Sequence, residues 1–324
     1  MTAIQAGRST LSLSRDDKPI VIAALFIIAI LIGGTAYTWT RFGSAPLLSP
    51  NYLLQQLQIG AFLGIVAAGM MIVILISQID LSVPWTLTAA AMMATAIGGP
   101  WAIPVGLGVG LIVGIVNGLG IAYLRVPSMI FTLGVNAVMR GLMVAHTGGF
   151  APQTAATDLM RLLSAEHTFG IPNALFVWLA VSAIIVVILQ RMALGRYIYA
   201  IGNKEAAAYL AGVNTRGVTV ICFALCGLTA GLSGVLLAGY SNKAYQGMGD
   251  AYLLPSIAAV VIGGTNILGG RGRYLGTLIG VVLIVLLNSV LSIMEMPEAG
   301  RQVIYGGVII LMLLVYGRGE RVTS

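Results

Sequence analysis

Side chains that could carry out chemistry are scarce in this sequence. It has two histidines, His146 and His167, and two cysteines, Cys222 and Cys226. The cysteines lie four residues apart with no histidine nearby, so we interpret them as packing residues in an apolar helix. Neither an HExxH metal motif nor a GxxxxGKS/T phosphate-binding loop occurs in the sequence. We therefore expect no catalytic residue, no metal site and no cofactor held by this chain.

One arginine and several amides are the polar side chains that lie within apolar stretches. Ion-coupled carriers usually hold ionisable groups at mid-membrane, but only Arg140 is clearly inside such a stretch, with Asp80 at the boundary of another. Arg140 would either snorkel to the membrane surface or contact the solute as a gate. The amides would either bond neighbouring helices or line a pathway for a neutral, hydroxyl-rich solute. The pathway candidates are Asn117, Asn136, Arg140, Asn266 and Asn288.

The composition is that of a membrane protein. Of 324 residues, 58% are hydrophobic and 8% are charged, against roughly 25% charged in soluble proteins. The mean hydropathy is +0.98. The net charge of +7 comes from basic residues at the ends of apolar runs, a pattern that orients membrane proteins and does not indicate nucleic-acid binding.

The uncharged stretches predict an all-α, polytopic membrane protein with about ten transmembrane helices. A crossing helix needs about 20 residues, and continuous apolar runs exclude the alternation of a β-barrel. The glycine-rich stretch 251–270 is the one most suited to a re-entrant segment. The expected helices lie in 19–40, 42–79, 81–124 (two, turning near Gly98–Pro100), 126–157, 167–190, 217–242, 251–270, 274–294 and 302–317.

The basic residues predict the orientation of these helices. Cytoplasmic segments of membrane proteins are enriched in Lys and Arg, which favours cytoplasmic tails at 1–18 and 319–324 around a transmembrane domain at 19–318. The cytoplasmic cations would be Arg8, Arg15, Lys18, Arg125, Arg191, Arg196, Lys204, Arg216, Arg271, Arg273, Arg318 and Arg321, and the outer ones Arg41, Arg161, Lys243 and Arg301.

Glycine spacing predicts how the helices pack. Small residues four apart let membrane helices approach closely, and they recur at 110/114/118, 227/231 and 272/276/280. The run Gly106–Gly110 (GLGVG) follows no expected strand, so we interpret it as a packing surface and not as a nucleotide-binding loop.

The longest expected cytoplasmic segment, 191–216, contains a short amphipathic helix. Asn203 can cap its start, Glu205 favours its first turn and Gly212 can end it. Such a helix would either lie on lipid headgroups or dock a soluble partner.

Short motifs are spread over most of the chain, from about residue 55 to residue 318. They are Ile79–Val83, Thr132–Gly134 with Arg140–Gly141, Thr147–Gly149, Gly202–Ala207 with Leu210–Gly212, Cys226–Leu232, and Ile257–Thr265 with Gly269–Gly272 and Gly276–Gly280. Together they resemble the permease subunits of sugar-importing ABC transporters of the ribose, xylose, arabinose and galactose type. The sequence departs from that pattern at Pro84 and Gln78, where glycine is usual. Proline is tolerated at a helix start because its missing N–H would have no partner there.

The resemblance implies a multi-pass subunit of the bacterial inner membrane that is not itself an enzyme. It implies a second permease copy or paralogue, a cytoplasmic ABC ATPase that binds the ATP, and a periplasmic sugar-binding protein, all around a chain embedded in membrane lipid. The implied ATPase-coupling residues are Asn203, Glu205, Ala206, Ala207 and Gly212, and the residues that would dock the binding protein are Asp158, Arg161, Glu166, Asp250 and Arg301.

Three other functions remain open at the level of sequence. An importer of another small polar solute, such as a nucleoside, a polyol or a signalling furanone, would share these features. An ion-coupled secondary carrier would need mid-membrane acids, and a membrane-embedded enzyme would need clustered polar side chains near one interface. The sequence offers neither feature.

Overall fold

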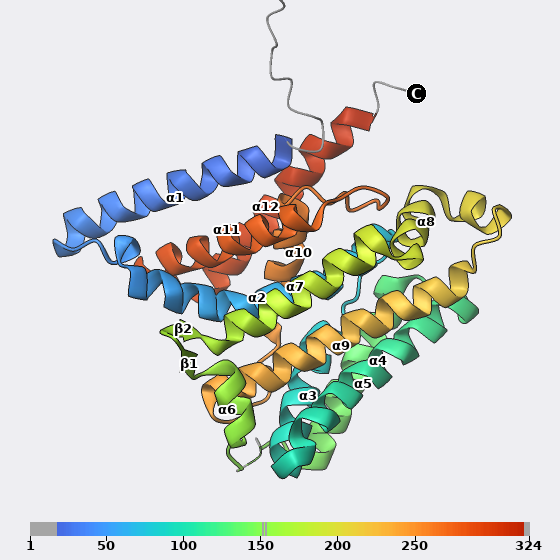
Figure 1. Cartoon of the computed structure of the whole chain (residues 1–324), viewed down its shortest axis with the longest axis horizontal. Helices are drawn as coiled ribbons and strands as arrows, with labels where there is room; N and C mark the ends of the chain where they lie inside the picture. The colour runs from blue at the N-terminus through green and yellow to red at the C-terminus, as the bar shows by residue number, and fades with distance from the viewer. Residues whose placement is uncertain (1–17, 151, 153, 321–324) are drawn as a thin grey trace, which may run out of the picture.

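The computed structural model describes residues 18–150, 152 and 154–320. The two expected tails therefore lie almost wholly outside the described residues. The regular secondary structure of the described residues is helical, apart from one two-stranded hairpin (Figure 1). Seven of its helices are long and apolar enough to cross a membrane: α1 (Lys18–Phe42), α2 (Pro50–Leu75), α4 (Ala102–Leu124), α5 (Ser128–Thr147), α7 (Asn173–Arg191), α9 (Thr215–Ser241) and α11 (Tyr274–Ile293).

Two of the ten expected segments contain only short helices. Helix α3 (Val83–Ile97) has 15 residues and α10 (Leu253–Ile262) has 10, which correspond to about 22 Å and about 15 Å of a hydrocarbon layer about 30 Å thick. The last expected segment is occupied by α12 (Glu298–Glu320). The all-α, polytopic expectation is confirmed, whereas a count of ten full crossings is not.

Several smaller elements were not anticipated from the uncharged stretches. Helix α6 (Asp158–Ser164) and the hairpin of β1 (His167–Thr168) and β2 (Ile171–Pro172) precede α7. Because the hairpin turn carries no charge, counting uncharged residues merged it with α7. The remaining small elements are the 3₁₀ turns η1 (Pro46–Leu48), η2 (Gly99–Trp101) and η3 (Asp250–Tyr252). Helix α8 (Ala193–Leu210) contains the short amphipathic helix expected in 191–216 but begins earlier in the chain.

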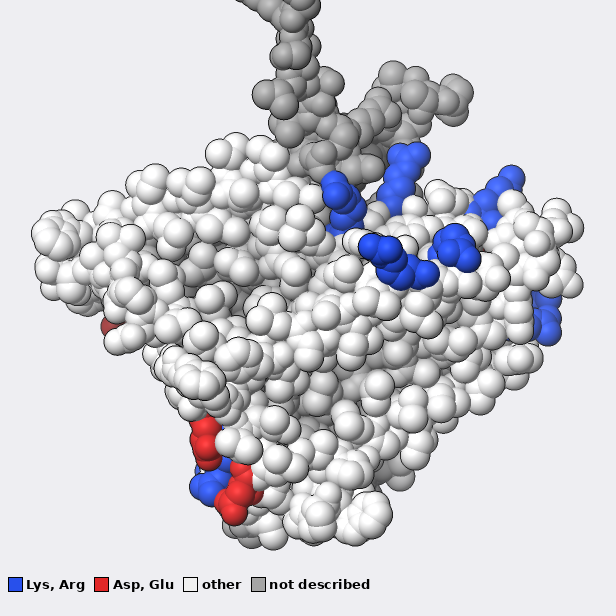
Figure 2. All heavy atoms as spheres, viewed as in Figure 1, with Lys and Arg blue, Asp and Glu red and all other residues white. Residues whose placement is uncertain are grey.

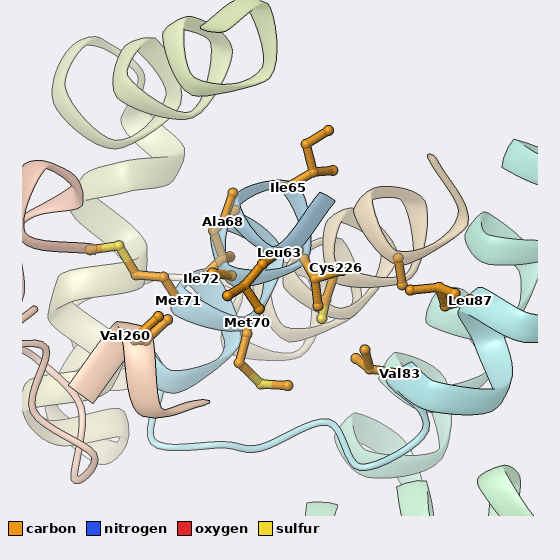
Figure 3. Packing of buried hydrophobic residues seen from close by; sticks show 14 of the residues in the cluster. Leu63, Ile65, Ala68, Met70, Met71, Ile72, Val83, Leu87, Cys226 and Val260 are labelled. Carbon is orange, nitrogen blue, oxygen red and sulfur yellow. The ribbon is translucent and has the colours of Figure 1, made fainter. Parts of the chain in front are cut away.

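Helix α2 forms the centre of the molecule. Its residues from Gly60 to Leu75 are all buried, as expected for a helix that is apolar on every face. Figure 3 shows Met70 and Met71 of α2 between Cys226 of α9 and Val260 of α10. Both cysteines are free and buried, in agreement with their interpretation as packing residues.

Helices α4 and α9 meet along a line of small residues. A Cβ atom built on Gly110 would lie 2.3 Å from the Gly227 carbonyl oxygen, and one on Gly114 would lie 2.3 Å from the Phe223 oxygen. This contact confirms that the glycine spacing serves helix packing. Gly272 is an exception because it lies in the loop before α11.

The chain runs through α2, an irregular segment that we call a break, α3, α4 and α5. The same order recurs as α9, a second break, α10, α11 and α12, whose helices run in the opposite direction across the molecule. The end of α2 lies near α8, since a Cβ on Gly202 of α8 would lie 1.8 Å from Leu75 O, whereas the end of α9 lies near α6, since a Cβ on Gly239 would lie 2.3 Å from Met160 O. We refer to these two ends of the molecule as the α8 end and the α6 end (Figure 1). The breaks are residues 76–82 and 242–249.

Candidate functional site

The starts of the two short helices meet inside the molecule. Gly249, at the end of the second break, donates its N–H to Thr88 Oγ1 of α3 (3.0 Å). A Cβ on Gly249 would lie 2.0 Å from the Pro84 carbonyl oxygen. Helix starts carry unpaired N–H donors and the positive end of the helix dipole, so two such ends face one another here.

Three expected functional residues gather beside this meeting point. Asn136 Oδ1 of α5 accepts a hydrogen bond from Trp85 N (3.3 Å), and the Arg140 guanidinium lies over the Trp85 ring at 5.7 Å. Arg140 also interacts electrostatically with Asp250. The structure thus brings two pathway candidates together with a residue expected in docking. Trp85 was missed from the sequence, although its place directly after the Ile79–Val83 motif and Pro84 was a usable signal.

Helix α5 connects both breaks. At its start, Thr132 Oγ1 accepts a hydrogen bond from Leu81 N (2.9 Å), and at its end Thr147 Oγ1 accepts one from Gln246 Nε2 (3.1 Å). The outward face of α5 is largely open, because a Cβ on Gly134 or Gly141 would meet no atom within 4 Å. Trp85 is buried, so Asn136 and the exposed Arg140 are the polar side chains of this group that could hydrogen-bond a neutral, hydroxyl-rich ligand.

Asn117 belongs to a different, fully buried cluster around Asp80. Asp80 is 1% exposed, and its Oδ1 accepts hydrogen bonds from Ser82 N (2.9 Å) and Ser82 Oγ (2.6 Å). Asn117 Nδ2 donates to Ser82 Oγ (2.7 Å) and reaches Asp80 Oδ1 at 3.3 Å. No ion pair to Asp80 is found within the described residues, and the start of α3, where helices carry a positive partial charge, follows it at Val83.

Replacing Asp80 should therefore weaken the fold through its hydrogen bonds. We expect Asp80→Ala to leave the donors of Ser82 without an acceptor, which costs about 1–3 kcal/mol per buried group. Asp80→Asn keeps one acceptor oxygen and should lose less. The thermal midpoint of the purified protein measures both effects, and equal midpoints for the two variants would contradict this role.

At the α8 end, helix α8 packs directly against the transmembrane body. A Cβ on Gly202 would lie 1.8 Å from the Leu75 carbonyl oxygen and 2.4 Å from Gly270 N. Tyr199 Oη donates to Gly272 O (2.9 Å). Burial raises the pKa of Tyr199, and the positive charge of Arg273 opposes that rise. The first half of α8 is thereby fixed to the end of α2 and to the loop before α11.

The second half of α8 projects from this contact and carries the expected coupling residues. The helix is interrupted at Lys204 (φ −162°), and Asn203 donates to Tyr199 O (2.9 Å) instead of capping the next turn as expected. Gly212 ends the segment with φ +85°, as expected. The segment exposes Glu205, Ala206, Ala207, Tyr209 and Leu210. Next to it lies a cleft of about 820 Å³ lined by residues that include Gln78, Arg125, Glu205 and Arg216.

The other expected residues are dispersed. Asn266 shapes a turn at the α8 end, where its Oδ1 accepts from Leu268 N (3.1 Å). Asn288 accepts from Arg301 Nη1 at 2.7 Å, beside a cavity of about 370 Å³ between α2, α10, α11 and α12. The pathway candidates therefore do not form one continuous lining.

Charge is distributed unequally between the two ends. Figure 2 shows basic side chains gathered at the α8 end and a mixed group at the α6 end. The mixed group includes Asp158, which pairs with Arg161, and Glu166. The described cations of the segments at the α8 end are Arg125, Arg191, Arg196, Lys204, Arg216, Arg271 and Arg273.

Comparison with known proteins decides the family. Residues 52–313 match the family described as the permease component of the branched-chain amino acid transport system. The chain belongs to this permease family. The permease is similar to the ribose import permease protein RbsC of Escherichia coli strain K12, with 35% identity over 83% of this chain and 88% of the relative. No solved structure matches it.

More distant relatives extend this picture. The permease is 34% identical to the ribose import permease protein RbsC of Bacillus subtilis strain 168, over 83% of this chain and 85% of the relative. It is 29% identical to the autoinducer 2 import system permease protein LsrC of Escherichia coli O9:H4, over 92% of this chain and 86% of the relative. With its apolar helices, the permease is a multi-pass protein of the bacterial inner membrane.

Proposed function

We propose that this permease is the membrane-spanning subunit of an ATP-driven importer that translocates a monosaccharide. The observation that carries the proposal is its 35% identity to a ribose import permease over most of both chains. The chemistry beside α5 agrees with it, because Asn136 and Arg140 offer hydrogen-bonding groups. A neutral sugar requires such partners and no fixed counter-charge.

The α8 end faces the cytoplasm in this proposal. Seven described cations gather there, against Arg41, Arg161, Lys243 and Arg301 at the opposite end, as the positive-inside rule requires. The chain then crosses the membrane ten times with both termini inside, and α3 and α10 complete their crossings through the two breaks. Irregular backbone at membrane depth is tolerated where it is buried in protein, as it is at Asp80 and Ser82 of the first break and at Met248 and Gly249 of the second.

Three partners follow from this orientation. An ATPase docks on Glu205, Ala206 and Ala207 and on the exposed Tyr209 and Leu210. The ATPase, and not the permease, binds the ATP. A second permease copy covers the open face of α5 and completes the solute pathway. A periplasmic sugar-binding protein docks at the α6 end.

Alternating access would arise from movement of α8 relative to the breaks. Closure of the ATPases pulls on the projecting half of α8, and Gly202 and Tyr199 transmit that movement to α2 and to the loop before α11. Helix α5 responds because it is bonded to both breaks.

The proposal is tested by reconstituting the permease in liposomes with its ATPase and its binding protein. We expect uptake of radiolabelled ribose to require ATP and both partners. Uptake by the permease alone, driven by an ion gradient after ATP depletion, would favour the secondary carrier instead. ATP-dependent uptake of another solute with no uptake of any monosaccharide would retain the importer and change its substrate.

A further inference from the structure

Phe169 is an unusually exposed aromatic side chain at the α6 end. It is 97% exposed, more than any other large apolar side chain within the described residues. It lies at the tip of the hairpin between α6 and α7, where Thr168 pairs with Ile171 and leaves Phe169 and Gly170 as a two-residue turn. Covering an apolar ring that is exposed to water lowers the free energy of the system.

The backbone of this turn is unfavourable for phenylalanine. Both central residues have positive φ, +54° at Phe169 and +77° at Gly170, the combination found in type I′ hairpin turns. Asparagine and glycine adopt this conformation readily, whereas a bulky side chain does so rarely. The turn would therefore form more easily with asparagine at position 169, so folding does not account for the ring.

The ring is held on a fixed support. Asn173 N donates to Glu166 O (2.9 Å), and Asn173 Nδ2 donates to Leu162 O (2.7 Å), which ties both ends of the hairpin to α6 and α7. Met160 of α6 is fully buried. An aromatic side chain on such a support loses little conformational freedom when it binds a partner.

Charged groups lie on α6 and directly before the hairpin. Glu166 is exposed, the Asp158 side chain is 95% exposed, and Arg161 pairs with Asp158. Figure 2 shows acidic side chains beside a basic one at the α6 end. Because an exposed ion pair contributes little stability, Asp158 can exchange Arg161 for a cation on another protein.

We propose that Phe169 is the apolar anchor by which the permease binds the solute-binding protein, inserting into an apolar pocket whose rim carries Lys or Arg. This inference rests on the proposed function. An apolar centre with a charged rim is the usual organisation of a protein interface hot spot. A protein partner is favoured over lipid because Asp158 and Glu166 would have to approach the bilayer together with the ring, and carboxylates are costly there.

The decisive variant is Phe169→Asn in the complete importer held in lipid nanodiscs. Asparagine suits the turn, so the thermal midpoint should stay the same or rise. The affinity for the sugar-loaded binding protein should fall at least about tenfold, the expected effect of removing a buried aromatic ring. Phe169→Tyr, which retains the ring, should bind almost as the unaltered importer does. Uptake by Phe169→Asn should recover at saturating binding protein.

Two results would overturn the anchor. The first is unchanged affinity in Phe169→Asn. The second comes from Phe169→Cys labelled with an environment-sensitive fluorophore. Cys222 and Cys226 are buried and should escape labelling. A blue shift of the fluorophore's emission in liposomes without binding protein would assign the hairpin tip to lipid. If the unaltered importer fails to bind the binding protein at all, the proposed function itself is wrong.

Discussion

The variant Gly202→Ala is expected to abolish uptake while the permease remains inserted in the membrane. The added methyl group would lie 1.8 Å from the Leu75 carbonyl oxygen and 2.4 Å from Gly270 N. Both neighbours are backbone atoms that cannot rotate away, so α8 must move off the end of α2. Overpacking of this kind costs about 1–3 kcal/mol, and without contact between α8 and the body the movement of α8 should no longer drive uptake.

Measuring transport and ATP hydrolysis together separates this effect from misfolding. We expect reconstituted Gly202→Ala importer to hydrolyse ATP without uptake, because the exposed residues from Glu205 to Leu210 can still bind the ATPase. Gly33→Ala provides the control, since a Cβ at Gly33 in α1 meets no atom within 4 Å. Normal uptake by Gly202→Ala would show that α8 does not transmit movement through this contact.

The second large effect is expected at the contact between α4 and α9. In Gly110→Ala the new methyl group would lie 2.3 Å from the Gly227 carbonyl oxygen and 2.9 Å from the Gly231 Cα. The two helices must separate along their length, which should destabilise the protein by about 1–3 kcal/mol or more. Close packing is the main source of association between membrane helices, so little else compensates.

The same helix supplies a matched control. Gly108 lies two residues earlier in α4, and a Cβ there meets no atom within 4 Å. Gly108→Ala should be neutral or stabilising by up to about 1 kcal/mol, because alanine favours the helix. The thermal midpoints of the two variants, measured in the same detergent, test the assignment. If Gly108→Ala proved as damaging as Gly110→Ala, the effect would not come from this contact.

The sequence located the helices well because hydrophobicity and helix length are local properties. Each expected segment contains a helix, and the turn at Gly98–Pro100 separates α3 from α4 as expected. The stretch 251–270, singled out for its glycines as suited to a re-entrant segment, contains the short α10. The short length of α3 was not anticipated, because the break before it consists largely of uncharged residues. Only packing inside the protein makes irregular backbone acceptable there.

The roles of polar residues were harder to predict, because they depend on neighbours that are distant in the chain. Asn117, Asn136 and Asn266 are the same residue type in apolar surroundings, yet they bond to Ser82, to Trp85 N and to a local turn respectively. Nothing in the sequence distinguishes these three environments. Gly212 was correctly placed because a positive φ after a helix is a local preference of glycine.

The half-length helices also bear on how the chain enters the bilayer during synthesis. The insertion machinery retains segments of about 20 apolar residues, and α3, with 15 residues, and α10, with 10, fall short of that length. The next α-helix along the chain is full-length in each case, α4 after α3 and α11 after α10. Each short helix should therefore enter as one arm of a hairpin with its successor. The buried residues of the first break would then leave water only after α9 has packed on α4, which makes the contact between α4 and α9 a late product of biogenesis.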